Sequence, residues 1–334
     1  MSPVFLIAGL QSAGLFVSQR RMQLRRRAVF EIANTVIASA VAIALALTIK
    51  SVWALIISLV VGTIIATLLS FLVFERRLPR LRWEAAHVRE IISFGKWIFL
   101  STAIYFAATS YDRFYFVAAV PIAMAGIYGV ARTFSDMLAA LAQRAGALLV
   151  FPRAAAMQDR REELAPRLRN TRRKTLALVA LTIGAAVAAS DQFILLAYDP
   201  RYHAAAFMVP LLIVGVWFGI LSTFADSMLM GAGRPAPGAW ANLAKFAVML
   251  VGLPIALANG SLLEALVVLV LAEVARWLAL LPPSRRERFA GLSDDLALTL
   301  LMAATALAAK WLLGAMGLVP TMSEWWALRG LLYV

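Results

Sequence analysis

Apolar blocks of about twenty residues follow one another along almost the whole chain, and they restrict its fold more than any other feature. A helix needs about 20 mostly apolar residues to cross the hydrocarbon core of a bilayer. The strands of a membrane barrel alternate apolar and polar residues instead, and these blocks show no such alternation. The sequence therefore predicts an all-α polytopic membrane protein.

Nine of the blocks are long enough to be predicted as membrane-spanning helices. They are Ala28–Lys50, Val52–Phe74, Phe94–Ala119, Ala125–Phe151, Thr175–Leu196, Ala206–Met230, Ala236–Ala258, Leu262–Leu281 and Leu296–Leu313. Two weaker blocks, Pro3–Val17 and Leu318–Val334, raise the expected number of helices to about 10 or 11. Sequences that break helices separate the blocks, among them Gly233-Arg234-Pro235, Asn259-Gly260 and Pro282-Pro283.

The composition excludes most soluble and catalytic classes. Of the 334 residues, 62% are hydrophobic, 15% are charged and none is cysteine. The lack of cysteine excludes thiol catalysis, iron–sulfur clusters and cysteine zinc sites. No nucleotide-binding loop, serine-nucleophile elbow or histidine cluster is present. Asp191, Asp199 and His203 share one predicted outer loop, but their spacing matches no specific site. We therefore expect no cofactor, no metal and no enzymatic activity.

Lysine and arginine gather in alternate connections between the blocks. Twenty-three of them lie in one set of connections, at residues 20–27, 76–96, 153–174, 234 and 285–288. The other connections hold Lys50, Arg113 and Arg201. The positive-inside rule places the first set in the cytoplasm, and the strict alternation supports the number of spans. It also explains the net charge of +14 without nucleic-acid binding, which would need a basic face on a soluble domain.

This orientation sets expectations for two shorter segments. Pro3–Val17 would run inward from an outer Met1, and no basic residue precedes it, so we do not expect a signal peptide. The simplest expectation is a chain that begins partway through a longer protein. The basic segment Arg153–Lys174 is predicted to form a cytoplasmic helix that lies on anionic headgroups.

Ionisable residues within the predicted spans are the main candidates for function. Each costs several kcal/mol in a bilayer unless it faces a protein interior or a water-filled cavity. They are Asp112, Arg113, Arg132, Asp136, Arg144, Asp226, Lys245, Glu264, Glu273, Arg276 and Lys310. Arg132 and Asp136 stand four residues apart, so they share a helix face and can pair.

The same residues also allow structural roles. Glu273 and Arg276, three residues apart, can form a static ion pair, and Arg276 and Lys310 can extend to the membrane interface. Arg132, beside Tyr128, lies too deep in its block for that. A cavity-facing role and an ion pair with Asp136 are both open for Arg132.

Short motifs follow one another in a particular order along the chain. They are Arg20-Arg21 with Leu24-Arg25, Val52-Trp53-Ala54-Leu55, Phe94-Gly95-Lys96-Trp97, Asp112-Arg113, the segment from Gly126 to Arg132, Val150-Phe151-Pro152, the segment from Tyr198 to Tyr202, and the segment from Gly231 to Arg234. Together they resemble the bacterial polysaccharide flippases of the multidrug/oligosaccharidyl-lipid/polysaccharide exporter superfamily. The resemblance covers essentially the whole chain.

The resemblance implies two six-helix lobes around a cationic cavity, which carry undecaprenyl-pyrophosphate-linked glycans across the inner membrane by alternating access. On that plan, residues 1–93 are a partial first lobe with a basic loop, 94–281 a complete second lobe and 282–334 additional helices. About three helices of the first lobe would then lie upstream. The expected partners are the lipid-linked oligosaccharide, membrane lipids, and the glycan polymerase and glycosyltransferases of the same pathway.

The resemblance also suggests roles for individual residues. Cations in the cavity would offset the charge of the pyrophosphate. The candidate substrate-binding residues are Arg113, Tyr128, Arg132 and Lys245. The candidate residues for ion or proton coupling are Asp112, Asp136, Asp226 and Glu273. Two alternatives stay open: a drug/cation antiporter of the same superfamily, and a membrane glycan polymerase or ligase, which would normally have a large outer loop.

Overall fold

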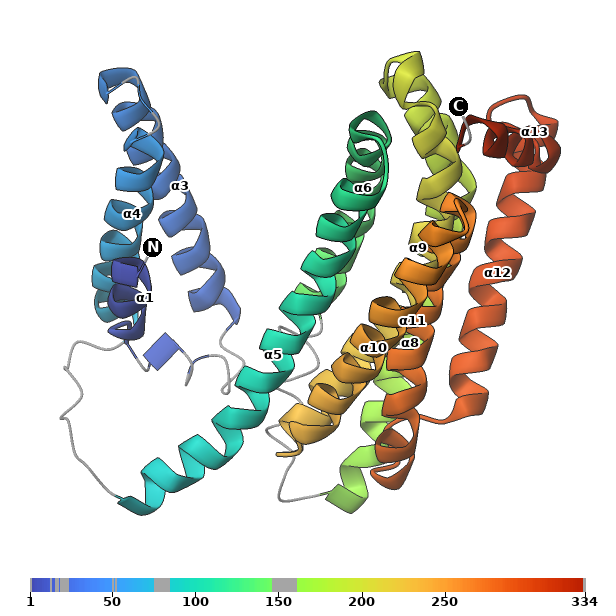
Figure 1. Ribbon diagram of the computed structural model, residues 1–334. Coiled ribbons are helices and arrows are strands. Elements are labelled where there is room, and N and C mark those ends of the chain that lie inside the picture. Colours follow the sequence, from blue (N-terminus) through green and yellow to red (C-terminus); the bar gives the residue numbers. More distant parts are fainter. Residues whose placement is uncertain are drawn as a thin grey trace. The chain divides into compact units, whose positions relative to one another are not determined.

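The computed structural model describes residues 2–12, 14–15, 18, 24–49, 51, 53–74, 85–145 and 161–332 (Figure 1). Every regular element in these ranges is a helix. The long ones are α3 (Leu24–Ile49), α4 (Trp53–Val73), α5 (Ala85–Ala119), α6 (Ile122–Ala145), α8 (Arg161–Ala197), α9 (Ala204–Gly231), α10 (Ala236–Ala258), α11 (Leu262–Arg286) and α12 (Leu292–Ala315). The shorter ones are α1 (Ser2–Gly9), η3 (Pro200–Tyr202), α13 (Met322–Ala327) and η4 (Leu328–Leu332).

Seven long helices in the described ranges are apolar enough to cross a membrane, namely α3, α4 and α8 to α12. Helices satisfy their own backbone hydrogen bonds, which is why such apolar runs become helices in a bilayer. The prediction of an all-α polytopic membrane protein is confirmed. Helices α5 and α6 have 35 and 24 residues, but charged side chains interrupt their apolar stretches. Those charges form the site described below.

The turns between the last spans follow the predicted breakers, with one exception. Gly233 (φ 80°) and Gly260 (φ 70°) adopt the left-handed conformation that glycine tolerates, and they end α9 and α10. The predicted break at Pro282-Pro283 is wrong, because α11 continues through both prolines to Arg286. Arginines in its last turn interact favourably with the negative end of the helix dipole, which helps to explain the extension.

The predicted surface helix Arg153–Lys174 is not a separate element where the structure describes it. Residues 161–174 are the first turns of α8, which continues through Pro166 to Ala197, and residues 153–160 lie outside the described ranges. Arg172 Nη1 lies 2.6 Å from Asp295 Oδ1, and Trp277 Nε1 donates to the other oxygen of this carboxylate at 2.9 Å. These buried contacts hold the start of α8 against α11 and α12.

The chain divides into two compact units, Met1–Val88 and Arg89–Val334. In the first unit α4 packs against α1 and α3, and the ring centroids of Phe30 and Phe74 lie 5.4 Å apart. In the second unit α9 is the central helix and packs against α6, α8 and α11. Most of its residues are buried, including Trp217 and Phe224. This buried helix is the core on which the site is built.

Candidate functional site

The hairpin of α5 and α6 places three polar side chains opposite one another. The chain reverses at Pro121, so residues a similar distance before and after it face each other. The rings of Phe116 and Tyr128 stack with centroids 3.9 Å apart. One turn further from the reversal, the Tyr128 hydroxyl donates to Asp112 Oδ2 at 2.7 Å. Arg132, four residues after Tyr128, lies on the same face of α6.

Asp112 is fully buried, and its negative charge is compensated on all sides. Arg132 Nε lies 2.9 Å from Asp112 Oδ2, and the backbone N–H of Arg113 donates to Oδ1 at 2.9 Å. A buried carboxylate without such partners would be strongly unfavourable. The partner of Arg132 on the neighbouring helix is thus closer than the predicted partner on its own helix, since Arg132 Nε lies 3.7 Å from Asp136 Oδ1.

Asp136 links an exposed arginine of the hairpin with a buried one. Its carboxylate pairs with Arg113, whose side chain is 60% exposed, as well as with Arg132, which is 13% exposed. Asp136 itself is 36% exposed. The two arginines therefore share one carboxylate, and they lead from an accessible position to a buried one.

A second group of ion pairs lies on α9, α10 and α11. Lys245 Nζ is 2.5 Å from Glu273 Oε1, and Arg276 Nη2 is 4.0 Å from Asp226 Oδ2. Each pair joins two helices, which differs from the predicted pair between Glu273 and Arg276 on one helix. Arg276 is 6% exposed, so the prediction that it extends to the membrane interface is wrong. Burial of the guanidinium requires a nearby carboxylate, and Asp226 supplies it.

Tyr105 of α5 connects the two groups, and the sequence analysis missed it. Lys245 Nζ and Arg276 Cζ lie 5.2 and 5.3 Å from the centroid of its ring, in cation–π geometry. Tyr105 stands seven residues, or two helical turns, before Asp112. That spacing puts both on one face of α5 and is the signal that could have identified Tyr105.

Two small cavities lie among these side chains. Arg132, Lys245 and Glu273 line both of them. The first has a volume of about 20 Å³ and is otherwise mainly apolar, and the second has about 30 Å³ and also meets Tyr105, Asp136 and Arg276. Either volume has room for a water molecule. The charged groups thus surround an internal polar space instead of packing into a sealed core.

We call this arrangement the central network. Its cations are Arg113, Arg132, Lys245 and Arg276, and its carboxylates are Asp112, Asp136, Asp226 and Glu273, with Tyr105 and Tyr128 between them. The structure brings together all eight residues predicted for substrate binding and coupling. Four of its buried atoms make no hydrogen bond in the described part of the chain, namely Arg132 Nε, Asp226 Oδ1, Glu273 Oε2 and Arg276 Nε. The two carboxylate oxygens can accept a hydrogen bond or take up a proton, and the Arg276 N–H can donate to water or a ligand, whereas Arg132 Nε faces Asp112 in its ion pair.

Glycine permits the closest of these contacts. A Cβ atom on Gly238 of α10 would lie 2.2 Å from Asp226 Oδ1, and one on Gly219 of α9 would lie 3.3 Å from Glu273 Oε2. The first distance is impossible for a real side chain, so Asp226 occupies space that only glycine leaves open.

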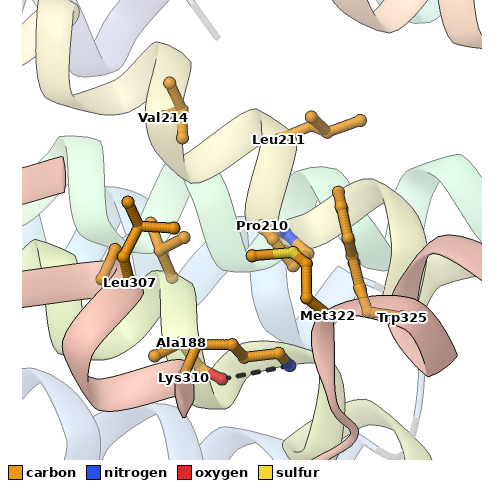
Figure 2. Close-up of a pocket in the computed structure, with 10 residues that line it drawn as sticks. Ala188, Pro210, Leu211, Val214, Leu307, Lys310, Met322 and Trp325 are labelled. Carbon is orange, nitrogen blue, oxygen red and sulfur yellow. Dashed lines mark hydrogen bonds between the residues drawn. The ribbon is translucent and has the colours of Figure 1, made fainter. Parts of the chain in front are cut away.

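A separate pocket lies between α8, α9, α12 and α13 (Figure 2). It has a volume of about 120 Å³, and its walls are apolar residues such as Pro210, Leu307 and Trp325. The Lys310 ammonium is its polar group, and it contacts the Ala188 carbonyl at 3.4 Å and pairs with Asp191. The pocket offers one cation in an otherwise apolar wall, whereas several cations and carboxylates line the cavities of the central network, so the pocket is the weaker candidate.

This pocket corrects two further predictions. Asp191 is a buried residue within α8 and does not lie in an outer loop with Asp199 and His203. Lys310 is buried too, so it does not extend to the membrane interface. The described residues hold no group of three acidic or histidine side chains that could bind a metal ion.

A family model described as "Polysaccharide biosynthesis protein" matches residues 1–206. The chain belongs to this family. The match includes α5 and α6 with Asp112 and Arg132, whereas Lys245 and Glu273 lie beyond it. No curated protein and no solved structure matches the chain. Its membership and its apolar helices make this polysaccharide biosynthesis protein a multi-pass membrane protein.

Proposed function

We propose that this protein flips an undecaprenyl-pyrophosphate-linked oligosaccharide across the bacterial inner membrane by alternating access, and that it is a transporter and not an enzyme. The family and the predicted resemblance to polysaccharide flippases support a lipid-linked glycan as the substrate. The observation that carries the proposal is the central network, in which cations line an internal polar space. An anionic pyrophosphate needs such cations to leave water.

The ion pairs determine how an anion would bind. Each cation of the network already has a carboxylate within 4.0 Å. A pyrophosphate that draws Arg132 toward itself therefore separates it from Asp112. A buried carboxylate left without its partner is costly unless it takes up a proton or a metal cation. This requirement gives the four carboxylates their proposed role in coupling.

Exposure suggests the order in which the cations would act. The side chain of Arg113 is 60% exposed, that of Arg132 is 13% exposed and that of Lys245 is 3% exposed. We propose that the pyrophosphate first meets Arg113 and then Arg132, which lines the cavities. Lys245 would act last, after its ion pair with Glu273 opens. A guanidinium suits this task because it binds two phosphate oxygens at once.

The test substitutes Arg132 at the native locus and measures membrane protein level and surface glycan together. If Arg132 binds the pyrophosphate, Arg132→Ala abolishes glycan export and leaves most of the protein in the membrane. Arg132→Lys keeps partial export, because it retains the charge and loses only the planar fork. Arg144→Ala is the control, since Arg144 is an exposed cation in the last turn of the same helix.

A purely structural role would give a different pattern. Arg132→Ala would then lower the membrane level, and the double variant Arg132→Ala/Asp112→Asn would restore both level and export, because neither charge remains buried alone. That recovery would remove Arg132 from the substrate path. Normal glycan export combined with lost efflux of cationic compounds would favour the drug/cation antiporter instead.

A further inference from the structure

A second basic site lies at one end of the second unit, where α8 begins and α11 turns into α12 (Figure 1). An open cleft of about 860 Å³ is present there. Its charged lining residues are Arg169, Arg173, Arg285, Arg286, Glu287, Arg288 and Asp294, and we call it the arginine cleft. By the positive-inside rule this end is the predicted cytoplasmic one. The central network shares no residue with it.

The arginine cleft has a surplus of positive charge. Both carboxylates of its lining are already paired, Asp294 with Arg169 Nε at 2.6 Å and Glu287 with Arg234 Nη1 at 2.7 Å. The other arginines of the lining have no carboxylate within ion-pair distance among the residues that the structure describes. They are Arg173, Arg285, Arg286 and Arg288. A cleft of this kind attracts an anion without first opening an ion pair.

The backbone at Arg288 is a second, independent observation. Arg288 has φ 58°, and it is the one residue other than glycine with positive φ in the described ranges. Its N–H donates to the Arg285 carbonyl, and the N–H of Phe289 donates to the Ser284 carbonyl, both at 3.0 Å. These two bonds form a Schellman motif, whose left-handed position strongly favours glycine. An arginine therefore stands in the cleft at a position where glycine would fit with less strain.

Topology alone does not require this arrangement. The positive-inside rule depends on the number of basic residues near the ends of the spans, and it is satisfied wherever they point. It demands neither the convergence of arginines from two separate segments on one cleft nor a strained backbone at one of them. Both features indicate a ligand.

We propose that the arginine cleft binds the phosphate of an anionic phospholipid in the inner leaflet. The apolar part of α12 begins at Leu296, two residues after the cleft residue Asp294, so the cleft lies at the depth of the headgroups. Guanidinium groups make paired hydrogen bonds to phosphate oxygens. Basic pockets between membrane helices on the cytoplasmic side are suited to anionic headgroups.

The experiment titrates delipidated, purified protein in detergent with phosphatidylglycerol and follows binding by native mass spectrometry. Phosphatidylcholine, which has no net charge, is the lipid control. Each arginine near an anionic membrane surface contributes roughly a fivefold change in affinity. We expect Arg285→Ala/Arg286→Ala to weaken phosphatidylglycerol binding about 25-fold. The control Arg201→Ala removes an arginine that is 73% exposed and lies on a predicted outer connection, and it should leave binding unchanged.

Arg288→Gly separates binding from folding. Glycine relieves the left-handed backbone, so the midpoint of thermal unfolding should stay equal or rise. Phosphatidylglycerol binding should nevertheless weaken about fivefold, and Arg288→Lys should recover most of it. Wild-type affinity in both Arg288→Gly and the double variant overturns the proposal.

A final arm tests the source of the phosphate. Inorganic pyrophosphate is added to the wild type in place of lipid, and the midpoint of thermal unfolding is measured. We expect no shift that depends on the cleft at pyrophosphate concentrations equal to those at which phosphatidylglycerol saturates the protein. A shift caused by binding at the central network would be the same in the wild type and in Arg285→Ala/Arg286→Ala. A shift with pyrophosphate that is lost in Arg285→Ala/Arg286→Ala, without one from phosphatidylglycerol, would identify a soluble anion and overturn the assignment to a lipid.

Discussion

Arginine gathers at two places in the second unit, and the two differ in burial and in charge balance. In the central network every cation lies near a carboxylate, whereas in the arginine cleft four arginines have no such partner in the described ranges. Solvation explains the difference, because water stabilises an exposed guanidinium and a buried one needs a counter-charge. The network can therefore bind an anion only by giving up an ion pair, and the cleft can bind one directly.

The largest expected loss of stability comes from a substitution in the buried central network, Asp112→Asn. Asp112→Asn leaves Arg132 with Asp136, whose Oδ1 is 3.7 Å from Arg132 Nε and which Arg113 shares. Arginine cannot lose its proton, so its charge stays buried. Loss of one partner from a buried ion pair costs about 3–5 kcal/mol. We expect a clear fall in membrane level and in the midpoint of thermal unfolding.

Arg132→Ala should destabilise the protein less than Asp112→Asn does. The remaining carboxylate can take up a proton and keep its hydrogen bond with Tyr128. Asp199→Asn is the control, because the pair of Asp199 with Arg201 is exposed and worth at most about 1 kcal/mol. Equal losses from Asp112→Asn and Asp199→Asn would contradict the role assigned to burial.

The next prediction compares the loss of stability at two neighbouring carboxylates of α12, one in a buried ion pair and one in an exposed pair. Asp295 pairs with Arg172 at 2.6 Å, and both side chains are 2% exposed. Asp294 pairs with Arg169 at the same distance, but the arginine is 48% exposed. We expect Asp295→Asn to cost about 3–5 kcal/mol and Asp294→Asn less than about 1 kcal/mol. Thermal unfolding in detergent compares them, and similar midpoints for the two variants would be evidence against the argument.

The sequence predicts features that depend on local patterns, and it does not predict contacts between residues that are distant in the chain. Apolar blocks and a spacing of four residues are local patterns, so the nine long helices in the described ranges and the shared face of Arg132 and Asp136 were predictable. The high cost of charge in a bilayer selected the residues of the central network. It did not identify their partners, because Asp112 and Arg132 lie on different helices and no period relates them.

Several of the wrong predictions have the same cause. Lys310 pairs with Asp191, which is 119 positions away in the chain, and nothing in the sequence links them. The sequence predicts a separate helix at the basic start of α8, because the contact of Arg172 with Asp295 depends on the packing of α8 against α12 and leaves no local pattern. The cost of placing a charge in the bilayer did not single out Tyr105, because an aromatic ring is uncharged and common in a membrane helix.

The third prediction tests how closely the buried charges are packed. Gly238→Ala places a Cβ 2.2 Å from Asp226 Oδ1, so Asp226 has to move relative to Arg276. Overpacking of this kind costs about 1–3 kcal/mol. Gly129→Ala is the matched control, since a Cβ there meets nothing within 4 Å and alanine favours a helix. A Gly238→Ala protein as stable as Gly129→Ala would mean that Asp226 is not held in place.

The smallest change in stability is expected in the exposed arginine cleft. Arg285→Gln and Arg286→Gln remove exposed charges that have no carboxylate partner in the part of the chain that the structure describes. Their loss should change the stability of lipid-free protein by no more than about 0.5 kcal/mol. Because like charges repel, each variant should be slightly stabilised at low salt, and the gain should vanish at about 1 M salt, where the screening length falls to about 3 Å. Thermal unfolding at the two salt concentrations measures this. A loss of several kcal/mol from either variant would show that these arginines belong to a buried ion pair, and the distinction between the network and the cleft would then be wrong.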